Sequence, residues 1–254
     1  MLGRMWYGIG RVLTALYALL MLKVSIVFQS PIPEGAFILA ANHPSTVDPA
    51  AITLLTNRHV TILIRHELFK IPLFGRSLRI SGHVPVVRGC GQAALDKAEK
   101  LLKAGRPVAI FPEGEITPKI NSVEQPSARS GVARLALSSG APVIPVGIHL
   151  EHRRRKVMET RVDGVVLEGY WYLRGPYAMT VGEPMSFSGS VEDREWVRKV
   201  SVQIMDRIVE LSEASARRLE AENLFPLVSK ESVFAAWRAV YRWARGILGA
   251  LRIA

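Results

Sequence analysis

Short runs of valine and isoleucine, most of them bounded by proline or glycine, alternate with helix-like segments in the first 150 residues. The runs lie at 36–41, 60–64, 83–87, 107–112 and 142–148. Their length, their β-branched content and their flanking residues favour buried strands over helices. Strands that alternate with helices predict an α/β domain, with a single mixed sheet that helices cover on both faces.

The helix-like segments between these runs have apolar residues at helical spacing. Residues 91–105 form such a pattern and end on a glycine, and residues 130–140 also end on a glycine. Beyond residue 150 the pattern loosens: a basic cluster precedes residues 162–187, which predict two or three more strands. Residues 191–222 are charged and periodic, and they predict a long helix.

The composition limits the possible partners. The chain has 254 residues, 49% of them hydrophobic, so it can bury one full core. Its net charge of +11 suits an acidic partner: nucleic acid, an anionic membrane surface or a phosphorylated substrate. Aromatic residues do not interleave with basic ones on the strand-like runs as a base-stacking surface requires, so we expect no nucleic-acid partner. The oligomeric state is not readable from the sequence.

Neither a disulfide nor a metal site is expected. Cys90 is the single cysteine, which excludes an internal disulfide and a cysteine-based zinc site. The six histidines are scattered and do not pair with carboxylates at metal-binding spacing. We therefore expect no metal ligands in this chain.

Residues 1–30 predict a helical segment that associates with a membrane. Basic residues precede the apolar run from Val12 to Leu22, but Lys23 follows where a signal peptide would have its small-residue cleavage site. The run is also short, because a membrane span needs roughly 20 apolar residues. An interfacial or re-entrant helix is therefore the favoured interpretation.

Residues 226–254 predict a basic amphipathic helix after the α/β domain at 31–225. At 100° per residue, one face of this helix is apolar and aromatic, and Arg238, Arg242 and Arg245 flank it. Such a helix suits an anionic bilayer surface, although it could also dock on the protein's own core. Both ends together predict a peripheral or monotopic protein at the cytoplasmic face of the cell membrane.

The stretch NHPSTVDP, residues 42–49, has both a structural and a chemical interpretation. Asp48 before Pro49 fits a helix start, with aspartate as the N-cap. This leaves Asn42 and His43 unexplained. A histidine at the end of a strand is where a general base would lie, and Asp48 can fold back onto one of its ring nitrogens. Such a pair alone arises often by chance.

Two other strand-like runs end in polar residues. The run at 107–112 leads into Phe111, Pro112, Glu113 and Gly114, and the run at 83–87 is followed by Arg88. Pro-Glu-Gly is ordinary turn chemistry, and a strand-end arginine is most often solvated. In a basic protein, however, such an arginine can also bind a phosphate.

The order of these features resembles the four sequence blocks of the glycerolipid acyltransferase family, whose best-known members acylate lysophosphatidic acid. The likeness covers roughly residues 36–187, including the helix and strand at 131–148 and the MTVGEP stretch at 179–184. The matching residues are Asn42, His43 and Asp48; Gly82 and Arg88; Phe111 to Gly114; and Val143 to Val146.

The resemblance implies transfer of a fatty acyl group from acyl-CoA or acyl carrier protein to a lysophospholipid hydroxyl, with 1-acylglycerol-3-phosphate as the first candidate. His43 would be the general base and Asp48 would orient it. The hydroxyl would attack the thioester directly, without an acyl-enzyme and without a cofactor. Binding of the acceptor would fall to Arg88, Glu113 and Gly114, with Asn42, Phe111 and Pro112 in support.

One departure from the family pattern concerns the acceptor. Family members commonly continue Phe-Pro-Glu-Gly with Thr-Arg-Ser, whereas this chain has Glu115, Ile116 and Thr117. Lys119 or Arg129 could compensate for the missing arginine. Two alternatives stay open: another lipid acceptor, such as a different lysophospholipid, a glycolipid or a lyso-amino-acid lipid, or a catalytically silent lipid-binding protein on the same fold.

Overall fold

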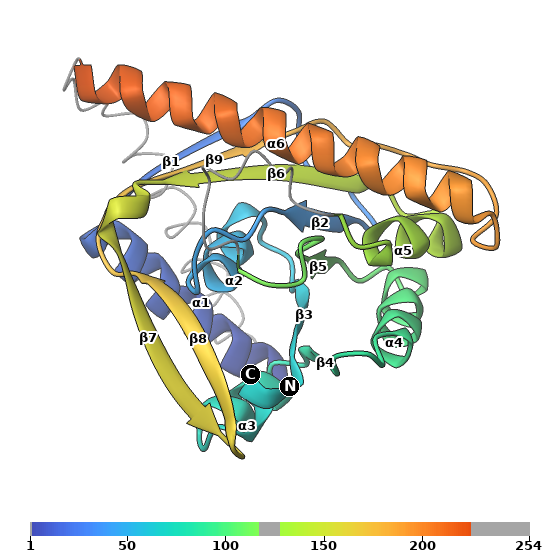
Figure 1. Ribbon diagram of the computed structural model, residues 1–254, viewed down its shortest axis with the longest axis horizontal. Helices are drawn as coiled ribbons and strands as arrows, with labels where there is room; N and C mark the ends of the chain where they lie inside the picture. The colour runs from blue at the N-terminus through green and yellow to red at the C-terminus, as the bar shows by residue number, and fades with distance from the viewer. Residues whose placement is uncertain (1, 117–127, 225–254) are drawn as a thin grey trace, which may run out of the picture.

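The computed structural model describes residues 2–116 and 128–224. A seven-stranded sheet runs through the molecule in the order β1-β9-β6-β2-β5-β3-β4 (Figure 1). Its strands are β1 (Leu22–Phe28), β2 (Ile38–Ala41), β3 (Thr61–Arg65), β4 (Val84–Val86), β5 (Val108–Ile110), β6 (Val143–Leu150) and β9 (Gly175–Val181).

The sheet is mixed. Strands β2 to β6 are mutually parallel, β9 is antiparallel to β6, and β1 is parallel to β9. All four residues of the central strand β2 are buried, as expected for a strand that is covered on both faces.

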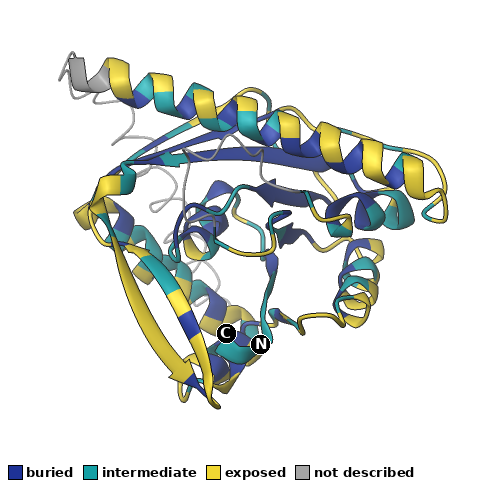
Figure 2. Ribbon diagram, viewed as in Figure 1, coloured by how far each residue is buried: buried dark blue, intermediate teal, exposed yellow. Residues whose placement is uncertain are grey.

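Helices cover both faces of this sheet (Figures 1 and 2). The helices are α1 (Leu2–Met21), α2 (Asp48–Ala51), α3 (Phe74–Ile80), α4 (Gln92–Lys103), α5 (Gly131–Ser139) and α6 (Arg194–Leu224), with 3-10 turns η1 (Ile52–Leu55), η2 (His66–Lys70) and η3 (His152–Arg154). The predicted α/β fold with a mixed, doubly covered sheet is confirmed. The long helix predicted at 191–222 is α6.

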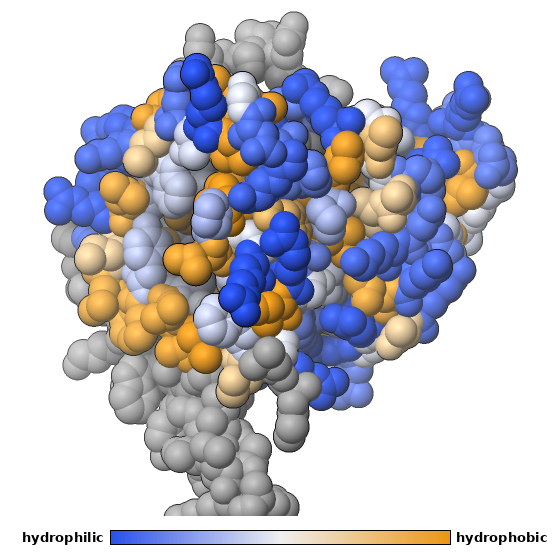
Figure 3. Space-filling view, turned by 90° about the horizontal axis from the view of Figure 1, so that it is seen from below, coloured by the Kyte–Doolittle hydropathy of each residue, from blue (hydrophilic) through white to orange (hydrophobic). Residues whose placement is uncertain are grey.

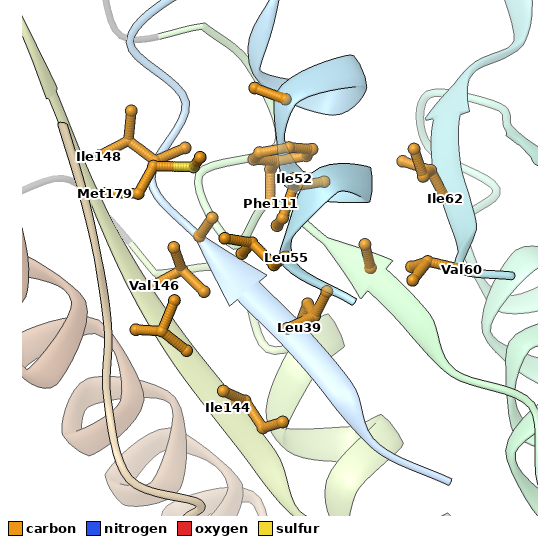
Figure 4. Close-up of a cluster of buried hydrophobic side chains, with 14 of the residues drawn as sticks. Leu39, Ile52, Leu55, Val60, Ile62, Phe111, Ile144, Val146, Ile148 and Met179 are labelled. Carbon is orange, nitrogen blue, oxygen red and sulfur yellow. The ribbon is translucent and has the colours of Figure 1, made fainter. Parts of the chain in front are cut away.

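Alternate residues of β2 enter two separate cores. Leu39 packs with Ile52 and other side chains of α2 and η1 (Figure 4), whereas Ile38 packs with side chains of α4, α5 and α6. Because successive side chains of a strand point to opposite faces, the same short strand anchors both helical layers.

A separate two-stranded antiparallel ribbon stands apart from the main sheet in Figure 1. It consists of β7 (Arg155–Val162) and β8 (Val165–Tyr172). Strands β8 and β9 account for the strands predicted within 162–187. Strand β7 lies in the basic segment and was not predicted, because it is mostly exposed and lacks the apolar alternation of a half-buried strand.

The prediction of a helical segment over residues 1–30 is wrong for its last third. Helix α1 ends at Met21, and residues 22–28 form the edge strand β1 of the main sheet. The sequence of this strand, LKVSIVF, is rich in the β-branched residues that suit a pleated sheet. The predicted C-terminal helix at 226–254 lies outside the described residues. None of the helices within the described parts of the chain is long and apolar enough to cross a membrane.

Helix α6 lies directly against the backbone of β6 at Gly147. A Cβ atom at this position would overlap the backbone of Leu211 and Ser212 in α6. The hydroxyl of Ser215 donates a 2.9 Å hydrogen bond to the Gly147 carbonyl. Only glycine therefore allows this contact between helix and strand.

We predict that Gly147→Ala lowers the free energy of unfolding by about 3 kcal/mol or more, because neither backbone can yield without separating α6 from β6. Urea denaturation measures this loss. The control is Gly10→Ala in α1, where an added Cβ meets no atom within 4 Å. That change should leave stability unaltered or raise it by up to about 1 kcal/mol. Equal stability of the two variants would contradict the close contact.

Candidate active site

The polar residues predicted from the sequence gather at the carboxyl ends of two neighbouring strands. Asn42 and His43 follow β2, and Phe111 to Gly114 follow β5, which pairs with β2 in parallel. Loops at the carboxyl ends of parallel strands are where α/β folds place their ligands. The sheet therefore brings two separate sequence motifs to one edge.

The centre of this site is the carboxylate of Asp48, which is fully buried. Its Oδ2 atom lies 2.9 Å from Nδ1 of His43 and accepts a 2.7 Å hydrogen bond from the Ser45 backbone N–H. Its Oδ1 atom accepts hydrogen bonds from the Ser45 hydroxyl at 2.6 Å and from the Tyr177 hydroxyl at 2.7 Å. Four donors match the four lone-pair sites of an ionised carboxylate.

The prediction that Asp48 is the N-cap of a helix is wrong, although a helix does begin at this residue. Helix α2 begins at Asp48, with Pro49 in its first turn, but no side chain caps it. The carboxylate instead turns back towards Ser45 and His43. The predicted contact between His43 and Asp48 is present, and it coexists with the helix start.

The contact with Asp48 sets the tautomer of His43. An ionised carboxylate can only accept a hydrogen bond, so Nδ1 of His43 carries the proton and Nε2 is left as the basic nitrogen. The ring of Phe111 stacks on the imidazole with a centroid separation of 4.3 Å and an interplanar angle of 25°. The His43 side chain keeps 13% of its surface exposed. The ring is thus held in place yet remains accessible.

Glu113 lies against the same loop. Its Oε1 accepts a 3.3 Å hydrogen bond from the His43 backbone N–H, and its Oε2 is buried with no hydrogen-bond partner among the described residues. Burial raises the pKa of Glu113 to about 7, and the negative charge of Asp48 adds to this rise, while the His43 N–H opposes it. Glu113 therefore titrates near neutral pH inside the site.

Asn42 joins the site to the strand on its other side. Its amide donates to the Ile148 carbonyl of β6 at 2.8 Å, and its side-chain oxygen accepts from the Ile148 N–H at 2.7 Å. The side chain thereby replaces a backbone partner where β2 ends. Its position indicates that it fixes the loop before His43.

Arg88 is connected to the loop of the site through Glu115. Its Nη2 atom is 3.3 Å from Oε1 of Glu115. Arg129 approaches the same oxygen at 3.7 Å, and its backbone N–H donates to the Pro112 carbonyl at 2.9 Å. Gly114 has a φ of +74°, and its N–H closes the turn onto the Phe111 carbonyl.

Three contributors to the site were not predicted. Ser45 lies within the same NHPSTVDP stretch, where a hydroxyl three residues before Asp48 was the available signal. Tyr177 comes from β9, 129 residues beyond Asp48, and no local pattern indicates it. Arg155 of the ribbon donates to the Pro44 carbonyl at 2.9 Å and lies over the ring of Tyr170.

Within residues 2–116 and 128–224, no three histidine, cysteine, aspartate or glutamate side chains gather in a way that could hold a metal ion. The expectation that the chain needs no metal or cofactor stays a prediction. Cys90 is free and exposed in the segment before α4. The groups of this site that can exchange a proton are the imidazole of His43 and the carboxylates of Asp48 and Glu113.

Comparison with known proteins identifies the family of this chain. The model of a protein family described as Acyltransferase matches residues 23–149, which is half of the chain. The chain is 27% identical over 132 residues to a 1-acyl-sn-glycerol-3-phosphate acyltransferase of Borreliella burgdorferi, covering 50% of this chain and 52% of that protein. It is 24% identical over 201 residues to the protein of that name from Saccharomyces cerevisiae, covering 77% and 63%.

The chain thus spans about half to two thirds of the length of these relatives. Among solved structures, the 1-acyl-sn-glycerophosphate (LPA) acyltransferase PlsC from Thermotoga maritima superposes with a TM-score of 0.52 at 23% sequence identity. The match covers 81% of this chain and 79% of that one. At this identity, the likeness bears on the fold.

We predict that Glu113→Gln changes how stability depends on pH. The folded pKa of Glu113 is about 7, above its ordinary value of 4.5, so the folded state binds this proton more tightly than the unfolded state. Relative to the variant, the wild type should lose stability as pH rises from about 4.5 and should approach its full loss, up to about 3 kcal/mol, above pH 7.

Urea denaturation of both proteins at several pH values between 4 and 8 measures this difference. Histidines elsewhere also titrate in this range, so only the difference between the two proteins carries the test. A constant difference across the range would show that Glu113 keeps an ordinary pKa.

Proposed function

Because the chain belongs to the acyltransferase family, we propose that it transfers a fatty acyl group from a thioester to a free hydroxyl of a lysophospholipid. Relatives of this chain are named as 1-acyl-sn-glycerol-3-phosphate acyltransferases, so 1-acylglycerol-3-phosphate is the first acceptor that we propose. Acyl-CoA or acyl carrier protein would supply the acyl group, and both are anionic partners suited to a chain of net charge +11.

One observation supports this reaction above the others: the His43 imidazole is bound through Nδ1 to the buried Asp48 at 2.9 Å. Its Nε2 is then the basic nitrogen, at a ring that is partly exposed. A neutral imidazole with a fixed tautomer can remove a proton from an alcohol near neutral pH.

The proposed reaction proceeds in two steps at the thioester carbonyl. Nε2 of His43 accepts the proton of the acceptor hydroxyl as the hydroxyl oxygen bonds to the carbonyl carbon. The tetrahedral intermediate then collapses and the carbon–sulfur bond breaks. The departing thiolate takes the proton back from His43, so the histidine is regenerated without an acyl-enzyme.

Asp48 stabilises this cycle through its charge. The imidazolium formed in the first step lies beside a carboxylate whose other partners, Ser45 and Tyr177, are neutral donors. Burial and the charge of Asp48 raise the pKa of Tyr177 well above its ordinary value, so its hydroxyl stays protonated and continues to donate. Among the described residues, Asp48 is the one anion that bonds the ring of His43.

We predict that His43→Ala lowers the rate of acyl transfer by about 10³-fold, within the usual range for loss of a general base. The assay incubates the protein with acyl-CoA or acyl carrier protein and a pool of lysolipids, and mass spectrometry identifies the acylated product. Far-ultraviolet circular dichroism should be unchanged, because Ser45 and Tyr177 still bind Asp48.

Two outcomes would contradict the proposal in different ways. Turnover retained in the variant would exclude His43 as the base. A folded wild-type protein that consumes no thioester with any acceptor in the pool would favour the silent lipid-binding alternative. If another lysolipid were acylated instead of 1-acylglycerol-3-phosphate, the proposed acceptor would be wrong and the proposed acyl transfer would stand.

We propose that the protein binds a membrane through α1, and that it does so on the cytoplasmic side, where acyl thioesters are made. Large apolar residues are exposed along one side of this helix, and Leu73 and Phe74 are exposed at the start of α3. The indole N–H of Trp6 donates to the Ser77 hydroxyl at 2.8 Å, so the two helices are neighbours. Figure 3 shows apolar residues gathered on the underside of the molecule. The exposed residues of α1 are Met5, Trp6, Ile9, Leu13, Leu16, Leu19, Leu20 and Met21.

We predict that the double change Leu13→Gln and Leu20→Gln weakens binding to phosphatidylglycerol-containing vesicles at least about tenfold, because both side chains are among the most exposed of α1. Co-sedimentation with vesicles measures the binding. Val202→Gln on α6, also an exposed apolar position, is the control and should bind normally. An equal loss in the control would place the membrane contact elsewhere.

A further inference from the structure

Two arginines converge on a single oxygen of Glu115, in the loop that follows β5. Oε1 of Glu115 is 3.3 Å from Nη2 of Arg88 and 3.7 Å from Nη2 of Arg129. Glu115 therefore lies between two cations, as a bound anion would.

The pair of arginines is built into the loop of the candidate active site. Arg129 packs on Gly114, where an added Cβ would lie within 2.8 Å of its guanidinium. Arg88 follows β4, at the same edge of the sheet as β2 and β5. Two residues before Glu115, Glu113 bonds the backbone of His43. An anion held by both arginines is thus connected to the proposed base through a short, continuous segment.

All three side chains are open to solvent: the exposed fractions are 76% for Arg88, 56% for Arg129 and 48% for Glu115. Ion pairs between exposed groups are weak and exchange with solvent ions. The planar guanidinium binds phosphate oxygens in the same geometry as carboxylate oxygens. A phosphomonoester carries about −1.5 to −2 charges near pH 7, so it is a stronger ligand for two arginines than one carboxylate.

We propose that Glu115 determines acceptor specificity by occupying the place of the acceptor's phosphate between Arg88 and Arg129. This inference rests on the proposed function. Binding of a phosphate-bearing acceptor exchanges the carboxylate for the phosphate, and no covalent bond changes. The built-in anion weakens the binding of every phosphate-bearing acceptor, and it has no such effect on an acceptor without phosphate.

The test compares Glu115→Gln with the wild type on two acceptors, 1-acylglycerol-3-phosphate and monoacylglycerol. Loss of two exposed ion pairs frees both arginines for the phosphate, so the KM for the phosphate-bearing acceptor should fall about fivefold. The KM for monoacylglycerol should change by less than about twofold. Glu183→Gln, an exposed residue beyond β9, makes the same change in charge and should leave both values unaltered.

A double variant tests whether the fall in KM depends on Arg129. In the Arg129→Gln background, Glu115→Gln should lower the KM for the phosphate-bearing acceptor by clearly less than in the wild type. An equal gain in both backgrounds would overturn the proposal. So would a rise in this KM in Glu115→Gln, which would mean that Glu115 positions the arginines for the phosphate.

Calorimetric titration with glycerol 3-phosphate tests the exchange of Glu115 for phosphate independently of acyl transfer. Tighter binding to Glu115→Gln than to the wild type would support the exchange even if no acyl transfer were detected. Unchanged binding beside normal acyl transfer would overturn the exchange and leave the proposed reaction intact.

Discussion

The arrangement of the site depends on the buried charge of Asp48. A carboxylate without exposure is strongly destabilising unless its lone pairs are filled, and here four donors fill them. Two of these donors belong to Ser45, in the same turn, and one to His43. The fourth, Tyr177, requires β9 to lie beside β6 in antiparallel orientation. The local turn and the global order of strands are thus tied to one carboxylate.

The sequence predicted the elements whose signals are local. The runs at 36–41 and 107–112 become strands, as short apolar runs that begin at a glycine or a proline predict. Parallel pairing then brings His43 and Glu113 together, as the strand-end positions of their motifs predict. The chain belongs to the acyltransferase family. The catalytic roles of His43 and Asp48 stay predictions that the His43→Ala assay addresses.

The remaining features depend on contacts between distant parts of the chain. Strand β7 of the ribbon is mostly exposed and its sequence has no apolar alternation. Its strand conformation therefore depends on pairing with β8. The boundary between α1 and β1 is not marked in the sequence, because the apolar run from Val12 to Leu22 extends one residue into β1. Pairing with β9 decides where the strand begins. The pairing of Glu115 with Arg88 and Arg129 joins three segments, and no local pattern distinguishes a paired glutamate from a solvated one.

Tyrosine contacts connect the proposed membrane helix to the carboxylate of Asp48. The hydroxyl of Tyr17 in α1 donates to the carbonyls of Tyr172 and Leu173. The ring of Tyr172 lies 6.3 Å from that of Tyr177, whose hydroxyl binds Asp48. Tyr172 and Tyr177 belong to one buried hydrophobic cluster, and Tyr17 packs against it. Close-packed interiors resist deformation. A bilayer that binds α1 would therefore fix the position of His43 relative to the membrane surface, where an amphiphilic acceptor presents its hydroxyl.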